Sequence, residues 1–153
     1  MSLGVNRDNS CSLFHYVPVE GSLKQLMRSG PIEFGANATP GCFTDFTACP
    51  AFQDSHHETI QIILYQDAFE LANPLGSAKG SFKLLGVYMT LGNLPHHYRA
   101  LADNMQLVLL CREKDVKEFG QKRVFQPLIN DLTHLESSGL EFEGKVYKVK
   151  LSF

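Results

Sequence analysis

The sequence has no excess of charge of one sign, no regular cysteine framework and no apolar run long enough to cross a membrane. Its 153 residues include 14 Lys plus Arg and 16 Asp plus Glu, which gives a formal net charge of -2. A near-neutral chain lacks the overall basic footprint of a protein that wraps nucleic acid. No segment approaches the roughly 20 apolar residues of a membrane helix, and no charged-then-apolar secretory signal begins the chain. We therefore expect an intracellular protein, nuclear or cytoplasmic, without membrane contact.

The four cysteines are few and unevenly spaced, at positions 11, 42, 49 and 111. This spacing favours free thiols in a reducing compartment over a disulfide framework. Cys42 and Cys49 with the adjacent His56 and His57 are a candidate zinc site, although the close cysteine pair of most zinc sites is missing. A loop with buried cysteines and exposed histidines explains the same residues. His96 and His97, next to a proline, are interpreted as a solvated turn.

What the chain does contain is enough apolar surface, at 44% hydrophobic and 10% aromatic residues, to bury one real core. Residues 1–58 are rich in proline and glycine. They predict an irregular N-terminal extension packed on the body, with no role assigned to the first three residues. One short helix is expected there over 19–29, because Leu23, Leu26 and Met27 share a stripe and Gly30-Pro31 is a stop signal.

Residues 59–153 alternate regularly and predict strands over 59–67, 83–93 and 104–111, a helix over 125–138 and a strand over 145–153. Short connections between the first three strands indicate a three-stranded antiparallel meander. A crossover helix would bring the fourth strand in beside the first, in parallel. The fold class is therefore α/β (α+β). In the third strand, alternation places Met105, Leu107, Leu109 and Cys111 on one face.

The helix over 125–138 has an apolar stripe that we expect to cover the sheet. Leu128 and Leu132 lie on it, and replacing either by Ala should cost about 2–5 kcal/mol if the side chain is buried. Pro127 fits the first turn of this helix, where its missing N–H is not needed.

Asp67 is the main candidate for chemistry, because it ends an otherwise apolar central strand. Open α/β folds place metal ligands and catalytic acids at such strand ends. A two-metal site needs several carboxylates, and the last strand ends in Lys150, Leu151, Ser152 and Phe153 without one. Asp67 could instead cap the strand and start the turn at 73–77.

Basic residues elsewhere are balanced or isolated. The run that contains Arg112, Lys114, Lys117, Lys122 and Arg123 is interspersed with Glu113, Asp115 and Glu118, which predicts a solvated surface. Lys148 and Lys150 share one face of the last strand. They could contact phosphates or protect an edge strand from pairing.

The segment Leu-Tyr-Gln-Asp-Ala-Phe-Glu at 64–70, followed by Asn-Pro-Leu-Gly-Ser at 73–77, resembles a known family. It is similar to transposon-encoded DDE transposases related to CACTA-type elements. The resemblance covers residues 13–153 and continues through the segments 83–88, 91–95 and 127–132.

This resemblance implies the N-terminal half of a ribonuclease-H-like catalytic domain, truncated to residues 59–153 here. Asp67 would correspond to the first acidic ligand for Mg²⁺. Many relatives have a second Asp where this chain has Ala68, and the next catalytic acid is expected just past the fourth strand. Asp67 would then be vestigial.

We therefore predict a domesticated, non-catalytic domain without a cofactor and with weak or no direct DNA binding. It would bind a protein partner or form a homodimer within a larger nuclear regulatory protein, such as a transcription regulator. The alternative is a fragment of an active Mg²⁺-dependent transposase whose remaining acids lie beyond Phe153.

Overall fold

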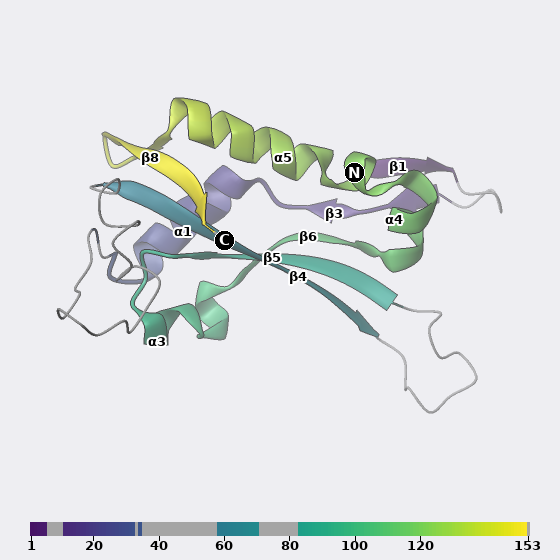
Figure 1. The fold of residues 1–153 in the computed structure, drawn as a ribbon, viewed down its shortest axis with the longest axis horizontal. Coiled ribbons are helices and arrows are strands. Elements are labelled where there is room, and N and C mark those ends of the chain that lie inside the picture. Colours follow the sequence, from purple (N-terminus) through teal and green to yellow (C-terminus); the bar gives the residue numbers. More distant parts are fainter. Residues whose placement is uncertain (6–10, 33, 35–57, 71–82, 153) are drawn as a thin grey trace.

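The computed structural model describes residues 1–5, 11–32, 34, 58–70 and 83–152, and it shows an α+β fold built on a curled mixed sheet (Figure 1). The six strands of this sheet are ordered β3-β6-β5-β4-β8-β7, and β1 and β2 form a separate pair. The strands are β1 (Ser2–Val5), β2 (Cys11–Leu13), β3 (His15–Tyr16), β4 (Thr59–Glu70), β5 (Lys83–Leu91), β6 (Gln106–Arg112), β7 (Leu140–Phe142) and β8 (Lys145–Ser152). The helices are α1 (Val19–Ser29), α3 (His96–Arg99), η2 (Ala102–Asn104), α4 (Glu113–Phe119) and α5 (Gln121–Ser138).

The centre of the sheet follows the predicted order. Strands β4, β5 and β6 are an antiparallel meander, and α5 then leads to β8. Strand β8 pairs in parallel with β4, from Thr59 opposite Lys148 to Ile63 opposite Ser152. A helical crossover is the usual way to return a chain for a parallel neighbour. The predicted place of the fourth strand beside the first is therefore confirmed.

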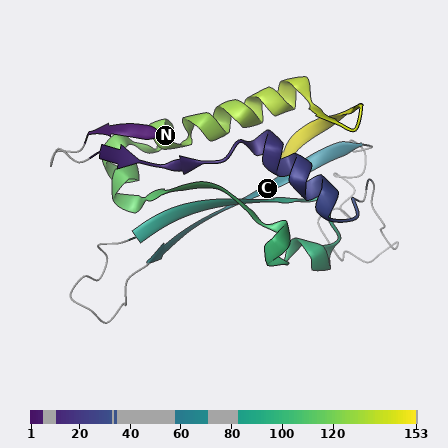
Figure 2. The same cartoon turned by 180° about the vertical axis from the view of Figure 1, so that it is seen from behind.

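Helices α1 and α5 lie on the same side of the sheet, as both views show (Figures 1 and 2). The core lies between them and the sheet. Every second side chain of β4 and β5 faces this core, and Ile60 and Ile62 of β4 are fully buried. The predicted stripe of α1 faces the core, since Leu23 and Leu26 are fully buried and Met27 is 7% exposed, and Val19 is buried with them.

Strand β6 does not keep the alternation that its sequence predicts. The pairing with β5 shifts between Val87 and Tyr88, where β6 has one extra residue, Val108. Such a bulge changes which residues face the core. Val108 and Leu109 are therefore both fully buried, whereas Leu107 is 38% exposed. The prediction that Leu107 shares the buried face of Leu109 is wrong for this reason.

Residues 2–5, 11–13 and 15–16 form three short strands that are not predicted from the sequence. Strands β1 and β2 form an antiparallel pair, and β3 joins the edge of the main sheet next to β6. Leu3, to which no role was assigned, is 1% exposed and belongs to the core. The prediction of irregular structure is wrong for this part. Strands of two to four residues carry too little alternation to be recognised.

The crossover helix begins earlier than predicted. Gly120, with φ of +85°, ends α4, and α5 starts at once with Gln121. The extra turn buries Val124 completely. Pro127 consequently lies inside the helix instead of in its first turn. Gly139 ends α5 as predicted, and its N–H donates to the Leu135 carbonyl at 2.9 Å.

Candidate functional site

Asp67 lies within β4, three residues before the strand ends at Glu70. It does not end the strand as predicted, because pairing with β5 continues through Ala68, Phe69 and Glu70. Its partner on β5 is Gly86, and its Oδ1 accepts a hydrogen bond from the Ala68 N–H at 2.8 Å. The carboxylate is exposed on the surface of the sheet.

The neighbours of Asp67 on its face of the sheet are aromatic side chains, a leucine and a glycine. Tyr65 and Phe69 flank it along β4, and Tyr88 and Leu84 flank its partner Gly86 along β5. The Tyr88 ring lies across Gly86, since a Cβ built there would be 3.0 Å from ring atoms. Glycine at position 86 therefore leaves room for the Tyr88 side chain. No carboxylate comes from these neighbouring positions.

These surroundings do not fit a site for two Mg²⁺ ions. Magnesium takes oxygen ligands and is held by carboxylates together with substrate phosphates. Among residues 1–5, 11–32, 34, 58–70 and 83–152, no three His, Cys, Asp or Glu side chains gather closely enough to hold a metal. Among the described residues, Asp67 therefore belongs to no group of three potential metal ligands. The candidate zinc ligands Cys42, Cys49, His56 and His57 and the turn at 73–77 lie outside the described residues.

Among the described residues, the surface around Asp67 is an open sheet face that points away from α1 and α5. We define it by the side chains that alternate with the core-facing ones: His15, Val17, Tyr65, Asp67, Phe69, Leu84, Tyr88, Leu107 and Leu110. Tyr65 is 50% exposed and Val17 47%. At the β3 end, residues 15, 17 and 107–110 line an apolar hollow of about 320 Å³. Such exposed apolar surface is typical of sites that contact another molecule.

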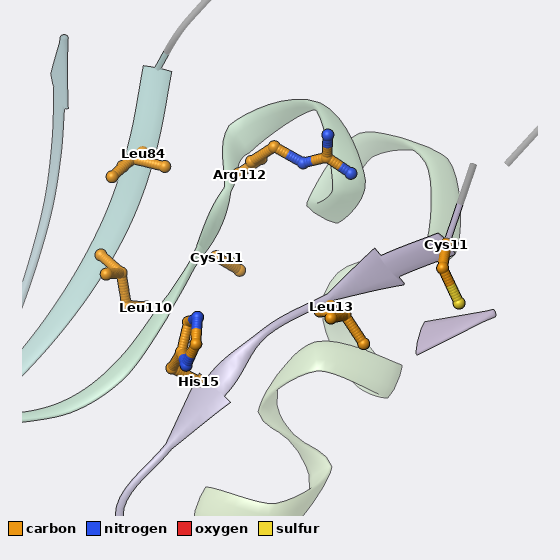
Figure 3. A pocket seen from close by; sticks show the side chains of 7 residues that line it. All are labelled: Cys11, Leu13, His15, Leu84, Leu110, Cys111 and Arg112. Atoms are coloured by element: carbon orange, nitrogen blue, oxygen red, sulfur yellow. The ribbon is translucent and has the colours of Figure 1, made fainter. Parts of the chain in front are cut away.

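A second hollow of about 310 Å³ lies where β2 and β6 meet (Figure 3). Cys11 and Cys111 both line it, with Leu13 between them in this view. Cys11 is exposed and Cys111 is buried, and both thiols are free. Burial, and then the charge of Asp115, raise the pKa of Cys111 to about 11. A thiol with a raised pKa is a poor nucleophile, so Cys111 does not resemble a catalytic thiol.

Arg112 at the rim of that hollow belongs to a buried polar network. Its Nε donates to Asp115 Oδ2 at 2.9 Å, and its second terminal nitrogen donates to Ser12 Oγ at 3.0 Å. Ser12 Oγ donates in turn to Asp115 Oδ1 at 3.1 Å. Asp115 is 0% exposed, so the prediction of a solvated charge run is wrong at this position. The exposed Lys117–Glu113 pair, 3.1 Å apart, fits the predicted solvated surface.

A second polar contact joins the start of α1 to α5. Tyr16 donates its hydroxyl hydrogen to Asp131 Oδ2 at 2.5 Å, and the Val19 N–H donates to the same oxygen at 3.1 Å. Asp131 therefore satisfies one of the unpaired N–H groups at the start of α1. Burial and the hydrogen bond to Asp131 raise the pKa of Tyr16 above its usual range.

The remaining predicted residues are on the surface. His96 and His97 are exposed in the four-residue helix α3, so the interpretation as a turn is corrected to a short helix. Lys148 and Lys150 are exposed on β8, whereas Val149 between them is buried. The predicted alternation of the last strand is confirmed at these positions.

Comparison with protein-family models gives no match, and comparison with curated protein sequences gives no significant one. In the described part of the chain, no helix has the length and apolarity that crossing a membrane requires.

Proposed function

We propose that this chain is a non-catalytic, transposase-derived domain that binds a protein partner or a second copy of itself. It would act within a larger, nuclear regulatory protein. The observation that carries the proposal is the open sheet face, where apolar side chains surround Asp67 and supply no further carboxylate. Exposed apolar groups release ordered water when a partner covers them, so this composition favours docking over ion binding.

The transposase origin is supported by the order of the elements. An antiparallel meander, a helix and a parallel fourth strand occur in the sequence that the resemblance to DDE transposases implies. A partial ribonuclease-H-like fold would have this arrangement, with Asp67 on its first strand.

The proposal is tested by site-specific photo-crosslinking in cells of the source organism. A photoreactive phenylalanine analogue at Tyr65 should give a discrete crosslinked product, with the chain itself or with one partner. The same analogue at the exposed Lys122 of α5 is the matched control and should not. The partner identified in this product by mass spectrometry must then bind the purified chain. Its affinity for the Tyr65→Lys variant must be at least tenfold lower.

Two results would overturn the proposal. One is crosslinking that is equal at Tyr65 and Lys122. The other is Mg²⁺-dependent nicking or joining of duplex DNA by the purified 153-residue chain, abolished by Asp67→Asn.

The register of β4 and β8 favours a second candidate function. In this alternative, the chain is a fragment of an active Mg²⁺-dependent transposase. Parallel pairing that reaches Ser152 opposite Ile63 directs the chain toward the level of Asp67. A carboxylate contributed beyond Phe153 could then lie near it. A chain extended by its native sequence should cleave DNA with Mg²⁺, and Asp67→Asn should abolish this cleavage. Asp67→Asn that changes only partner binding would exclude this function.

A further inference from the structure

In the part of the chain that the structure describes, strand β8 has an open edge over its second half. Strand β7 pairs only with its beginning, from Phe142 opposite Lys145 to Leu140 opposite Tyr147. Before β7 the chain comes from α5, which ends at Gly139, and a Cβ at Gly139 would lie 2.7 Å from the Tyr147 carbonyl oxygen. No strand of the described chain therefore pairs with residues 148–152 on the side away from β4.

The hydrogen bonds of β4 identify which backbone groups face this edge. The Gln61 N–H donates to Asn93 Oδ1 at 2.7 Å, and the Gln61 carbonyl accepts from the Gly92 N–H at 2.8 Å. Gln61 thus faces the β5 side. Since neighbouring residues of a strand direct their N–H and C=O groups to opposite sides, Ile60 and Ile62 face β8. Their bonds go to residues 148, 150 and 152, which leaves the backbone groups of Val149 and Leu151 directed outward.

An apolar groove runs next to this edge on the helix-covered side of the sheet. It has a volume of about 210 Å³ and lies between α5, which contributes Ile129, Leu132 and Glu136, and β8, which contributes Val149 and Leu151. Ile129 is 48% exposed there. Side chains of a strand added to β8 would enter this groove at every second position.

The charges on the two sides of the edge differ. Lys148 and Lys150 are exposed on the side of the sheet opposite the groove, whereas Glu136 lines the groove. Acidic side chains of an added strand would therefore be attracted to the lysine side and repelled from the groove side. The short strand β7 has this pattern on the same edge, with Leu140 and Phe142 buried and Glu141 exposed.

The same lysines disfavour a second copy at this edge. If two β8 strands paired antiparallel about Val149, Lys148 of one would lie directly opposite Lys150 of the other. Pairing about Lys150 would place the two copies of that residue opposite each other. Like charges in directly opposed positions destabilise a strand pair.

We propose that the open edge of β8 binds an extended segment of a protein partner with alternating apolar and acidic residues. Its apolar residues enter the groove beside Ile129 and Leu132, and its acidic residues face Lys148 and Lys150. This inference rests on the proposed function, since it names the kind of partner and the strand that binds it.

The test measures binding of labelled nine-residue peptides to the purified chain by fluorescence anisotropy. A peptide of alternating Val and Glu should bind at least tenfold more tightly than one of alternating Val and Lys. In the variant with both Lys148→Glu and Lys150→Glu this preference should reverse. Ile129→Arg, at an exposed position, should weaken binding of the Val/Glu peptide at least tenfold, whereas Lys122→Glu elsewhere on α5 should leave it unchanged.

Strand pairing itself is tested by N-methylation of the Val/Glu peptide. Only alternate N–H groups of an added strand face β8, so methylation of one set of amides should abolish binding and methylation of the other set should not. Equal loss with both sets, equal affinity for the Glu and Lys peptides, or no peptide binding would overturn the inference. A dimer that Ile129→Arg dissociates in sedimentation would also overturn it, in favour of a second copy.

These outcomes are separate from those of the proposed function. Crosslinking through Tyr65 on the open sheet face can succeed while the peptides fail. In that case only the assignment of the β8 edge is lost.

Discussion

At the scale of single residues, we expect the largest loss of unfolding free energy when Asp115 is replaced. It is fully buried and accepts hydrogen bonds from Arg112 and Ser12. Asp115→Ala removes the carboxylate that pairs with Arg112, and breaking a buried ion pair costs about 3–5 kcal/mol. Because the Arg112 side chain is 38% exposed, we expect about 3 kcal/mol of lost unfolding free energy in urea denaturation.

The exposed Lys117–Glu113 pair is the control for Asp115. Lys117→Ala should cost less than about 0.5 kcal/mol, as is usual for surface pairs on helices. Equal losses for Asp115→Ala and Lys117→Ala would contradict a structural role for the buried network.

Tyr16 should make stability depend on alkaline pH. Its pKa is raised by burial and by the hydrogen bond to Asp131, so folding favours the neutral phenol. The stabilisation is fully present below the unfolded pKa of about 10 and is lost as the pH rises toward the higher folded value. The free-energy difference between the parent chain and Tyr16→Phe should therefore narrow above about pH 10, as measured by urea denaturation.

A free-energy difference between the parent chain and Tyr16→Phe that stays constant over this pH range would show instead that the Tyr16 hydroxyl contributes nothing specific to the folded state.

At the scale of elements, α5 allows its two central leucines to be compared. Leu128 is 3% exposed and faces the core, whereas Leu132 is only half-buried because it borders the groove beside β8. Leu128→Ala should cost about 2–5 kcal/mol, as expected from the sequence. Leu132→Ala should cost less, which corrects the equal expectation for both. Urea denaturation of the two variants measures the difference, and a larger loss for Leu132→Ala would contradict this packing.

Long elements with clear periodicity could be predicted from the sequence, and short or irregular ones could not. Helix α1 and strands β4, β5 and β8 have enough alternating or helical apolar positions to be recognised. Strand β7 is three residues long, and its hairpin depends on the positive φ of Glu143 and Gly144. The bulge at Val108 arises from pairing with β5, which no local pattern of β6 contains.

The candidate site was predictable only in part, for a related reason. Asp67 stands out within an apolar strand, so a local pattern finds it. The neighbours that decide what it can do come from β5, across the strand pair at Gly86, and no local pattern gives that register. Asp115 was predicted to be solvated, and this was wrong. Its burial depends on a contact with Ser12, which is about a hundred positions away in the sequence.

At the scale of the whole molecule, the N-terminal segment and the residues after 58 contribute to one hydrophobic core. Val19, Leu23 and Leu26 of α1 belong to the same buried cluster as Val108 and Leu109 of β6. A fragment of residues 59–153 would expose this surface to water, and burial of apolar area is the main stabilising term in folding. We expect the fragment to lack a cooperative urea transition and a near-ultraviolet circular dichroism signal. A sharp transition matching that of the full chain would show instead that residues 59–153 fold independently.

The parallel pairing of β4 with β8 has a consequence for how the protein is made. Strands β4, β5 and β6 pair with near neighbours in the chain, but β4 must wait for β8, whose partner for Thr59 is Lys148. Closing so long a loop is slow compared with hairpin formation, and a ribosome delivers the C-terminal strand last. During synthesis, the backbone groups on the β8 side of β4 therefore stay unpaired after the hairpins have formed. A nascent chain in this condition offers chaperones a defined strand to hold, and neighbouring nascent chains a defined place to mispair.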